Sequence, residues 1–89
     1  MAKIKVRNMC SERSNREVPD QFIIEVGPNT YFQSYRTVIA AVVNGKIYLD
    51  PAWNCSRTTS KYRSQFLGEK AIETRKKIKE GKYVVTRLN

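Results

Sequence analysis

The dipeptide Asn44-Gly45 constrains the fold of this chain more than any other feature, because it separates two apolar runs. Residues 37–43 read TVIAAVV before it, and residues 46–50 read KIYLD after it. Asn-Gly is the preferred pair for a two-residue type I′ turn, since both of its positions need a positive φ. The sequence therefore predicts an antiparallel hairpin over residues 37–50.

Further strands are predicted on the N-terminal side of this hairpin. Ile4 and Val6 alternate with basic residues. This two-residue period predicts a strand with one basic, solvent-exposed face. Residues 22–26, FIIEV, are rich in β-branched side chains and predict a second strand. Residues 10–21 have no apolar period and end in Pro-Asp, so they predict a loop.

Two turn signals surround the next predicted strand, residues 31–35. Gly27-Pro28-Asn29-Thr30 is a strong turn sequence. Arg36-Thr37 separates two strand-like runs and predicts either a bulge or a tight bend.

The last third of the chain predicts two helices. Asn54 or Ser56 can cap the first helix through a side-chain oxygen, and Gly68 stands at the usual C′ position after residues 57–67. The second helix is predicted over residues 69–80.

Residues 83–88 predict a closing strand. Several strands, two helices and one strand form an α+β pattern, with a mainly antiparallel sheet and helices on one of its faces. With 89 residues, the chain is predicted to be one domain over residues 1–89.

The positive charge is concentrated towards the C-terminus. The net charge is +9, and residues 54–89 contain ten cations and three acids, which places +7 there. Such a surplus attracts phosphates or acidic surfaces, although a run of charge on one helix is often only a solvated face. The candidate partner-binding residues on the two predicted helices are Arg57, Lys61, Arg63, Arg75, Lys76, Lys77 and Lys79.

The composition argues against catalysis and against several sites. The chain has no histidine, which removes Ser-His and Cys-His nucleophile systems and the commonest metal ligand. Its acids form no evident catalytic pair, and its four glycines are isolated, so no phosphate loop is predicted. We therefore expect no enzyme activity, no cofactor, no metal and no small-molecule substrate.

The two cysteines and the apolar runs bear on the compartment. Cys10 and Cys55 are far apart and in no paired motif, so reduced thiols and a cytoplasmic location are predicted. The longest apolar run, residues 38–43, is too short to cross a bilayer. Arg57 and a helix N-terminus near Cys55 could activate its thiol, but a buried or half-buried structural cysteine is the preferred interpretation.

The middle of the chain resembles a known family. The stretches YFQSYRTVIAAV, NGKIYLD and WNCSRTTSKYRSQFLGE resemble small uncharacterised proteins of bacteriophages and prophages, which share patterns close to F-x-S-Y-x-[ST]-x-I-A and W-[DN]-x-S-x-T-T-x-[KR]-Y-R-x-x-F-L-G. The matching positions are Phe32, Ser34, Tyr35, Thr37, Ile39, Ala40, Trp53, Asn54, Ser56, Thr58, Thr59, Lys61, Tyr62, Arg63, Phe66, Leu67 and Gly68. Cys55 departs from the pattern, which usually has an aromatic residue there.

This resemblance implies a bacterial host cell and no particular function. Small phage proteins without catalytic groups often bind nucleic acid or disable a host complex. The first hypothesis is therefore a non-enzymatic protein that binds nucleic acid or a host ribonucleoprotein complex, through backbone contacts rather than base reading. The alternatives are a protein-directed inhibitor of host machinery, such as an anti-CRISPR protein, and an accessory protein that self-associates through the sheet edge. The shared pattern could also define a local structure rather than a binding face.

Overall fold

The Asn44-Gly45 hairpin is confirmed in the computed structural model, which describes residues 3–89. Strand β4 (Thr37–Val43) pairs antiparallel with β5 (Lys46–Leu49), and Val43 stands opposite Lys46. Asn44 and Gly45 have φ values of 51° and 76°, as a type I′ turn requires.

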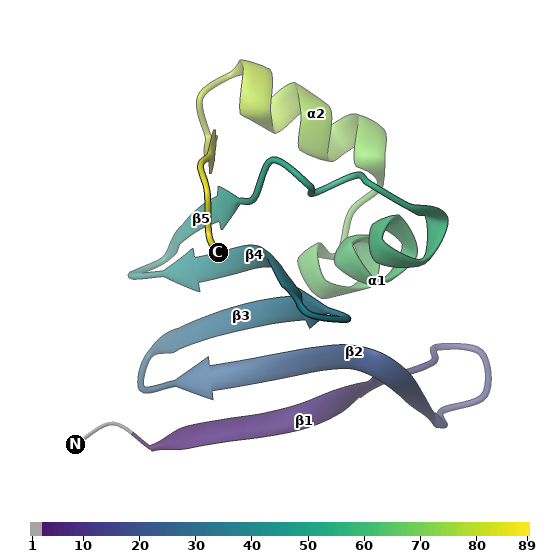
Figure 1. Ribbon diagram of the computed structural model, residues 1–89. Coiled ribbons are helices and arrows are strands. Elements are labelled where there is room, and N and C mark those ends of the chain that lie inside the picture. The colour runs from purple at the N-terminus through teal and green to yellow at the C-terminus, as the bar shows by residue number, and fades with distance from the viewer. Residues whose placement is uncertain (1–2) are drawn as a thin grey trace.

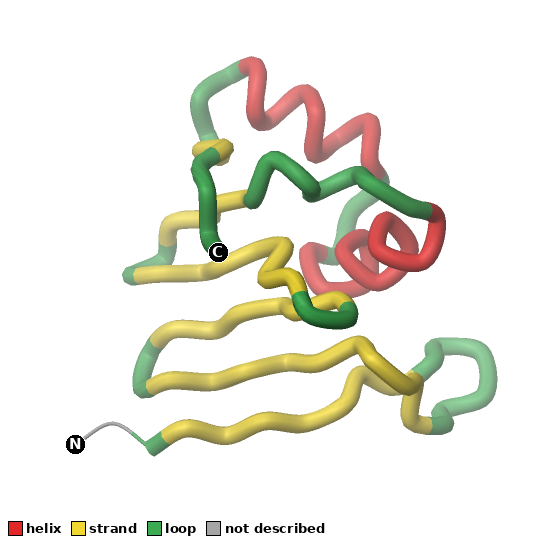
Figure 2. Tube along the Cα trace, in the orientation of Figure 1, coloured by secondary structure: helices red, strands yellow, loops and turns green. Residues whose placement is uncertain are grey.

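The hairpin belongs to a six-stranded sheet with the order β1-β2-β3-β4-β5-β6 (Figures 1 and 2). The other strands are β1 (Ile4–Cys10), β2 (Glu17–Val26), β3 (Asn29–Ser34) and β6 (Tyr83–Val85). The first five form an antiparallel meander, whereas β6 pairs parallel to β5. Both helices lie in the connection between β5 and β6, because a parallel pair needs a long crossover. The predicted α+β class is confirmed.

The predicted loop at residues 10–21 was wrong for half of its length. Strand β1 ends at Cys10 and β2 begins at Glu17, so only residues 11–16 lie outside the strands. The start of β2 is polar and has no alternating apolar residues that would indicate a strand. Pro19 and Asp20 within it are typical of turns. Asp20 has a φ of 62°, and its carbonyl accepts a 2.7 Å hydrogen bond from the Tyr35 amide.

Both ends of β3 are tight two-residue turns. Gly27-Pro28 joins β2 to β3 with Val26 opposite Asn29, and Tyr35-Arg36 joins β3 to β4 with Ser34 opposite Thr37. The tight bend therefore lies one residue before the predicted Arg36-Thr37. A bulge is present as well, since the register shifts after Phe32.

Helix α1 (Arg57–Leu67) has the predicted bounds. Ser56 is its N-cap, with Oγ accepting a 3.1 Å hydrogen bond from the Thr59 amide, and Gly68 ends it in the left-handed region at a φ of 70°. Helix α2 (Ala71–Lys79) is shorter than the predicted 69–80. Glu69 is outside it because the backbone of the N-cap residue Lys70 is extended, and the Glu69 carboxylate contacts α2, as described below.

The helices cover one face of the sheet. The Phe66 ring of α1 stacks on Phe32 of β3 with centroids 5.7 Å apart, and α2 contacts β6. In Figure 1, α1 lies beside β3 and β4, and α2 beyond β5. The core contains Met9, Ile23, Phe32, Ile39, Ala40, Leu49, Tyr62 and Tyr83. A buried hydrogen bond of 2.9 Å between Ser34 Oγ and Thr59 Oγ1 also ties α1 to β3.

The segment after β6 is held by side chains instead of a strand. The predicted closing strand over 83–88 is thus only Tyr83–Val85. Buried Asp50 accepts hydrogen bonds from the Leu88 amide at 2.9 Å and from the Asn89 side chain at 3.1 Å. The Asn89 amide group also pairs with both backbone groups of Val38, at 2.8 and 3.0 Å, as a strand neighbour would.

Candidate functional site

The three candidate cations of α1 divide between solvent and core. Arg57 and Lys61 are one helical turn apart and exposed, opposite the face that buries Thr59 and Tyr62. Arg63 is fully buried, with an exposed fraction of 0%. Its prediction as a partner-binding residue is therefore corrected, because its guanidinium has no surface to offer.

Arg63 instead binds the segment that precedes α1. Its Nη1 donates to the Trp53 carbonyl at 2.8 Å and to Asn54 Oδ1 at 3.1 Å, and its Nη2 donates to Ser64 Oγ at 3.2 Å. The guanidinium carbon lies 4.9 Å from the centre of the Trp53 ring. These contacts fasten the segment before the helix to the helix itself.

The Arg63 charge is solvated by the protein. Burial lowers the pKa of Arg63 from its usual value, while the nearby Glu69 carboxylate opposes that effect. An arginine stays protonated at neutral pH in spite of such a shift. No carboxylate lies within 4.0 Å of it among residues 3–89, and its buried Nε has no hydrogen-bond partner. Neutral oxygens and the Trp53 ring therefore stabilise this buried cation.

Trp53 links the two helices, a role that no local sequence pattern indicated. The Arg75 guanidinium carbon of α2 lies 5.5 Å from the Trp53 ring, which Arg63 of α1 also approaches. Arg75 is exposed, so its contact with Trp53 leaves its charge accessible to solvent. Its spacing from Arg63 in the chain could not have indicated a shared aromatic partner.

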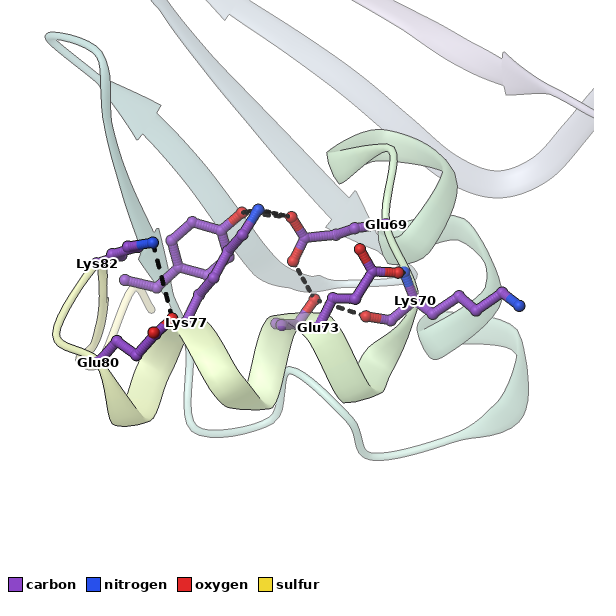
Figure 3. Close-up of polar contacts among 8 residues, drawn as sticks. Glu69, Lys70, Glu73, Lys77, Glu80 and Lys82 are labelled. Carbon is purple, nitrogen blue, oxygen red and sulfur yellow. Dashed lines mark hydrogen bonds and ion pairs between the residues drawn. The ribbon is translucent and has the colours of Figure 1, made fainter.

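Lys77 is the second candidate whose role is structural. Its Nζ lies 2.7 Å from Glu69 Oε1, and the two meet in Figure 3. The Glu69 side chain is only 4% exposed and that of Lys77 is 37% exposed. Tyr83 donates to the same Glu69 oxygen at 2.6 Å, and Thr74 donates to the other at 2.7 Å. We call these four residues the Glu69 cluster.

The Glu69 cluster shifts the pKa values of its members in mutually consistent directions. Burial alone would raise the pKa of Glu69, but hydrogen bonds from Lys77, Tyr83 and Thr74 outweigh it and hold that pKa below its usual value. The hydrogen bond to Glu69 raises the pKa of Lys77. Burial, with the Glu69 hydrogen bond, raises the pKa of Tyr83. The cluster therefore holds an ionised Glu69 against a cationic lysine and a neutral tyrosine.

Five of the seven candidate cations remain exposed. We call them the helical cations: Arg57, Lys61, Arg75, Lys76 and Lys79. None has a carboxylate within 4.0 Å in the part of the chain that the structure describes, where the ion pairs are Arg7–Glu25, Lys77–Glu69 and Lys82–Glu80. Arg75, Lys76 and Lys79 surround Ile72, which is 73% exposed, on the outward side of α2.

A shallow cleft of 640 Å³ separates the helix junction from the loop between β1 and β2. Lys61, Gly68 and Lys70 line its helical side, and Glu12 and Arg13 line its loop side. Its cations and acids are mixed, which is unsuited to a ligand of one charge. Lys61 is the helical cation that borders it.

Other kinds of site find little support in the described residues. Both cysteines are free and exposed, so the prediction of a buried or half-buried Cys55 was wrong. Between residues 3 and 89, no three Cys, Asp or Glu side chains gather as ligands of a metal ion would. No described helix has the length and apolar character needed to span a membrane.

The fold and these contacts define a small α+β protein in which six strands support two basic helices. The chain belongs to a family described as "Family of unknown function (DUF8033)", which matches residues 4–82. No curated protein and no solved structure matches it. The match agrees with the resemblance to an uncharacterised family, and the phage setting stays a prediction.

The residues that carried the resemblance have largely structural positions. Ser56 caps α1, Thr59 and Tyr62 are buried under it, and Gly68 ends it. Phe66 stacks on the sheet. This supports the alternative that the shared pattern defines a local structure, with Lys61 as an exposed exception.

Proposed function

We propose that this protein is a non-enzymatic, phage-type protein that binds the phosphate backbone of nucleic acid, free or in a host ribonucleoprotein complex, in the bacterial cytoplasm. The observation that carries the proposal is that the helical cations are exposed and have no acidic partner within the described residues. Unpaired Lys and Arg side chains release counterions when they neutralise phosphates.

The kind of contact follows from the side chains available. Arg57 and Lys61 lie on α1, and Arg75, Lys76 and Lys79 lie on α2, so the charge spans two helices. Trp53, which Arg75 contacts, is half-buried and is also approached by Arg63, so it is not an exposed platform for base stacking. Backbone-directed binding without sequence preference is the mode that such a surface supports.

The test is fluorescence anisotropy of labelled DNA and RNA against salt concentration. Affinity should fall steeply from about 50 mM salt upwards, with a logarithmic slope of roughly 0.9 for each phosphate neutralised on double-stranded DNA. The double variant Lys76→Ala/Lys79→Ala should lower the slope by about 2.

The matched control is Lys3→Ala/Lys5→Ala, which removes the same charge at the opposite edge of the sheet. Equal losses in the two variants would attribute the binding to net charge alone and reject the helical surface. No binding of DNA or RNA at about 50 mM salt would reject the proposal as a whole.

A second candidate is an inhibitor directed at an acidic host protein, anti-CRISPR activity included. Ile72 favours it, because phosphate binding has no use for an apolar side chain that is 73% exposed among three cations. The Ile72→Ser variant should weaken capture of a nuclease-treated host protein and leave nucleic-acid affinity unchanged. Loss of every partner after nuclease treatment would reject this candidate.

A further inference from the structure

The sheet face opposite the helices is largely apolar, and neither helix covers it. The strand register places Phe32, Ala40 and Leu49 beside one another in one row across the sheet, and this row faces the helices. Side chains alternate along strands, so the neighbouring row points away from the helices. That row, which we call the open row, consists of Val6, Ile24, Tyr31, Ala41, Tyr48 and Val84.

The side chains of the open row are only partly buried. Val6 is 61% exposed and Ile4, on the same face, is 68% exposed. Ile24, Tyr31, Tyr48 and Val84 are half-buried by one another, although neither helix packs on this side. A contiguous apolar surface of this kind is unusual on a monomer that has no partner for it.

The open face also lacks the charge that dominates the rest of the molecule. Within the regular stretches 4–8, 22–26, 29–33, 40–43 and 46–49, Lys46 is the one charged residue on this side, at the corner by the hairpin turn. Its Nζ lies 5.8 Å from the centre of the Tyr48 ring. A face with a single cation at its corner suits neither a phosphate polymer nor an acidic peptide.

We propose that the open face binds the open face of a second copy of this chain, forming a homodimer of two sheets packed between two helical layers. Sheets with apolar faces pack in this way at about 10 Å. A two-fold axis would set the tyrosines, valines and isoleucines of one open row against those of the other.

Area and electrostatics both favour this occupant. The molecule measures 35 × 34 × 20 Å, so a broad side has room for the roughly 800 Å² that each partner of a stable complex commonly buries. The two sets of helical cations would lie on opposite outer surfaces with both sheets between them, farther apart than the Debye length of about 8 Å at physiological salt. Two chains of charge +9 could therefore associate through this face.

The dimer is tested by sedimentation equilibrium at about 0.5 M salt, where polyanion binding is screened. The wild-type chain should sediment at twice its 10.3 kDa mass at about 100 µM. Failure of nucleic-acid binding would leave this result unchanged, so the two proposals are tested separately.

Tyr31→Lys puts a charge at the centre of the contact and should weaken the dimer about 100-fold. Val6→Lys, at an exposed position of the open row, should weaken it in the same direction and is the second variant if Tyr31→Lys does not fold. The matched control is Ile72→Lys, an exposed apolar residue of α2 with the same change in charge, which should leave the dimer intact.

A wild-type monomer at about 100 µM would overturn the proposal. So would a dimer that resists both open-row variants, because it would then form through the β1 edge or the helices. Recovery of the chain in a stable complex with a different apolar partner, in place of the homodimer, would overturn it as well.

Discussion

Tyr31 and Phe32 are neighbours in β3, but they lie on the two opposite faces of the sheet. Phe32 is fully buried and stacks on Phe66, whereas Tyr31 is half-buried in a row that no helix covers. Both residues belong to the same alternating pattern, which predicts which side chains share a face and not which face the helices choose. The covered face therefore contains the core of the monomer, whereas the other face has no helix packed on it.

Truncation of Phe32 and of Tyr31 should show the largest difference in stability between the two faces. Phe32→Ala should lower the free energy of unfolding by about 3–5 kcal/mol, because it leaves a cavity in the core. Tyr31→Ala should lower it by about 1 kcal/mol when measured on the monomer. Urea unfolding followed by circular dichroism measures both, and equal losses would contradict the assignment of the two faces.

Two arginines of α1 extend the comparison to the charged residues. Arg63→Met removes three hydrogen bonds and the Trp53 contact, so it should cost about 2 kcal/mol of unfolding free energy. Arg57→Met, at an exposed position of the same helix, should change it by less than about 0.5 kcal/mol. Thermal unfolding of the pair is the measurement, and a stable Arg63→Met would show that the buried charge is dispensable.

The Glu69 cluster gives the smallest of these effects and a dependence on pH. Glu69→Gln should lower the unfolding free energy by about 1–2 kcal/mol at neutral pH, because a charge-assisted network becomes neutral. The pKa of Glu69 is lower in the folded chain than in the unfolded chain, where it is about 4.3. Its contribution is therefore fully present above pH of about 4.3 and is lost as the pH falls through the folded pKa.

The difference in stability between wild type and Glu69→Gln should accordingly shrink on acidification, as denaturant titrations at several pH values would show. Burial would raise the pKa of Asp50, but hydrogen bonds from Leu88, Ala52 and Asn89 lower it. Asp50 is present in both proteins, so its contribution cancels in the difference. Glu12→Gln, an exposed loop residue, is the control with the same change in charge. A difference that is constant with pH would contradict an ionised Glu69.

Local signals predicted the backbone well where one or two residues suffice. Asn44-Gly45 gives the hairpin because its turn needs two positive φ values, and Ser56 and Gly68 give α1 through its cap and its left-handed end. The start of β2 was missed because its residues 17–20 are polar and follow an irregularity in which extra residues of β2 lie opposite Met9 of β1.

The candidate site was predicted less well, because helical spacing shows which residues share a face of a helix and not which other residues pack on that face. Arg63 was predicted to bind a partner, yet it is buried and its guanidinium donates hydrogen bonds to Trp53 and Asn54. Lys77 was also predicted to bind a partner, yet Glu69, which precedes α2 in the chain, and Tyr83, which follows it, both contact its amino group.

The sequence by itself determined the α+β class, the hairpin, the bounds of α1 and the excess of positive charge, because each depends on residues close together in the chain. Only the tertiary structure decided which cations are exposed, which sheet face is covered and where the segment after β6 is held. These features depend on contacts between distant residues, such as Asn89 with Val38 and Tyr83 with Glu69. Burial and pairing at that range change the role of a charged side chain without any trace in its local sequence.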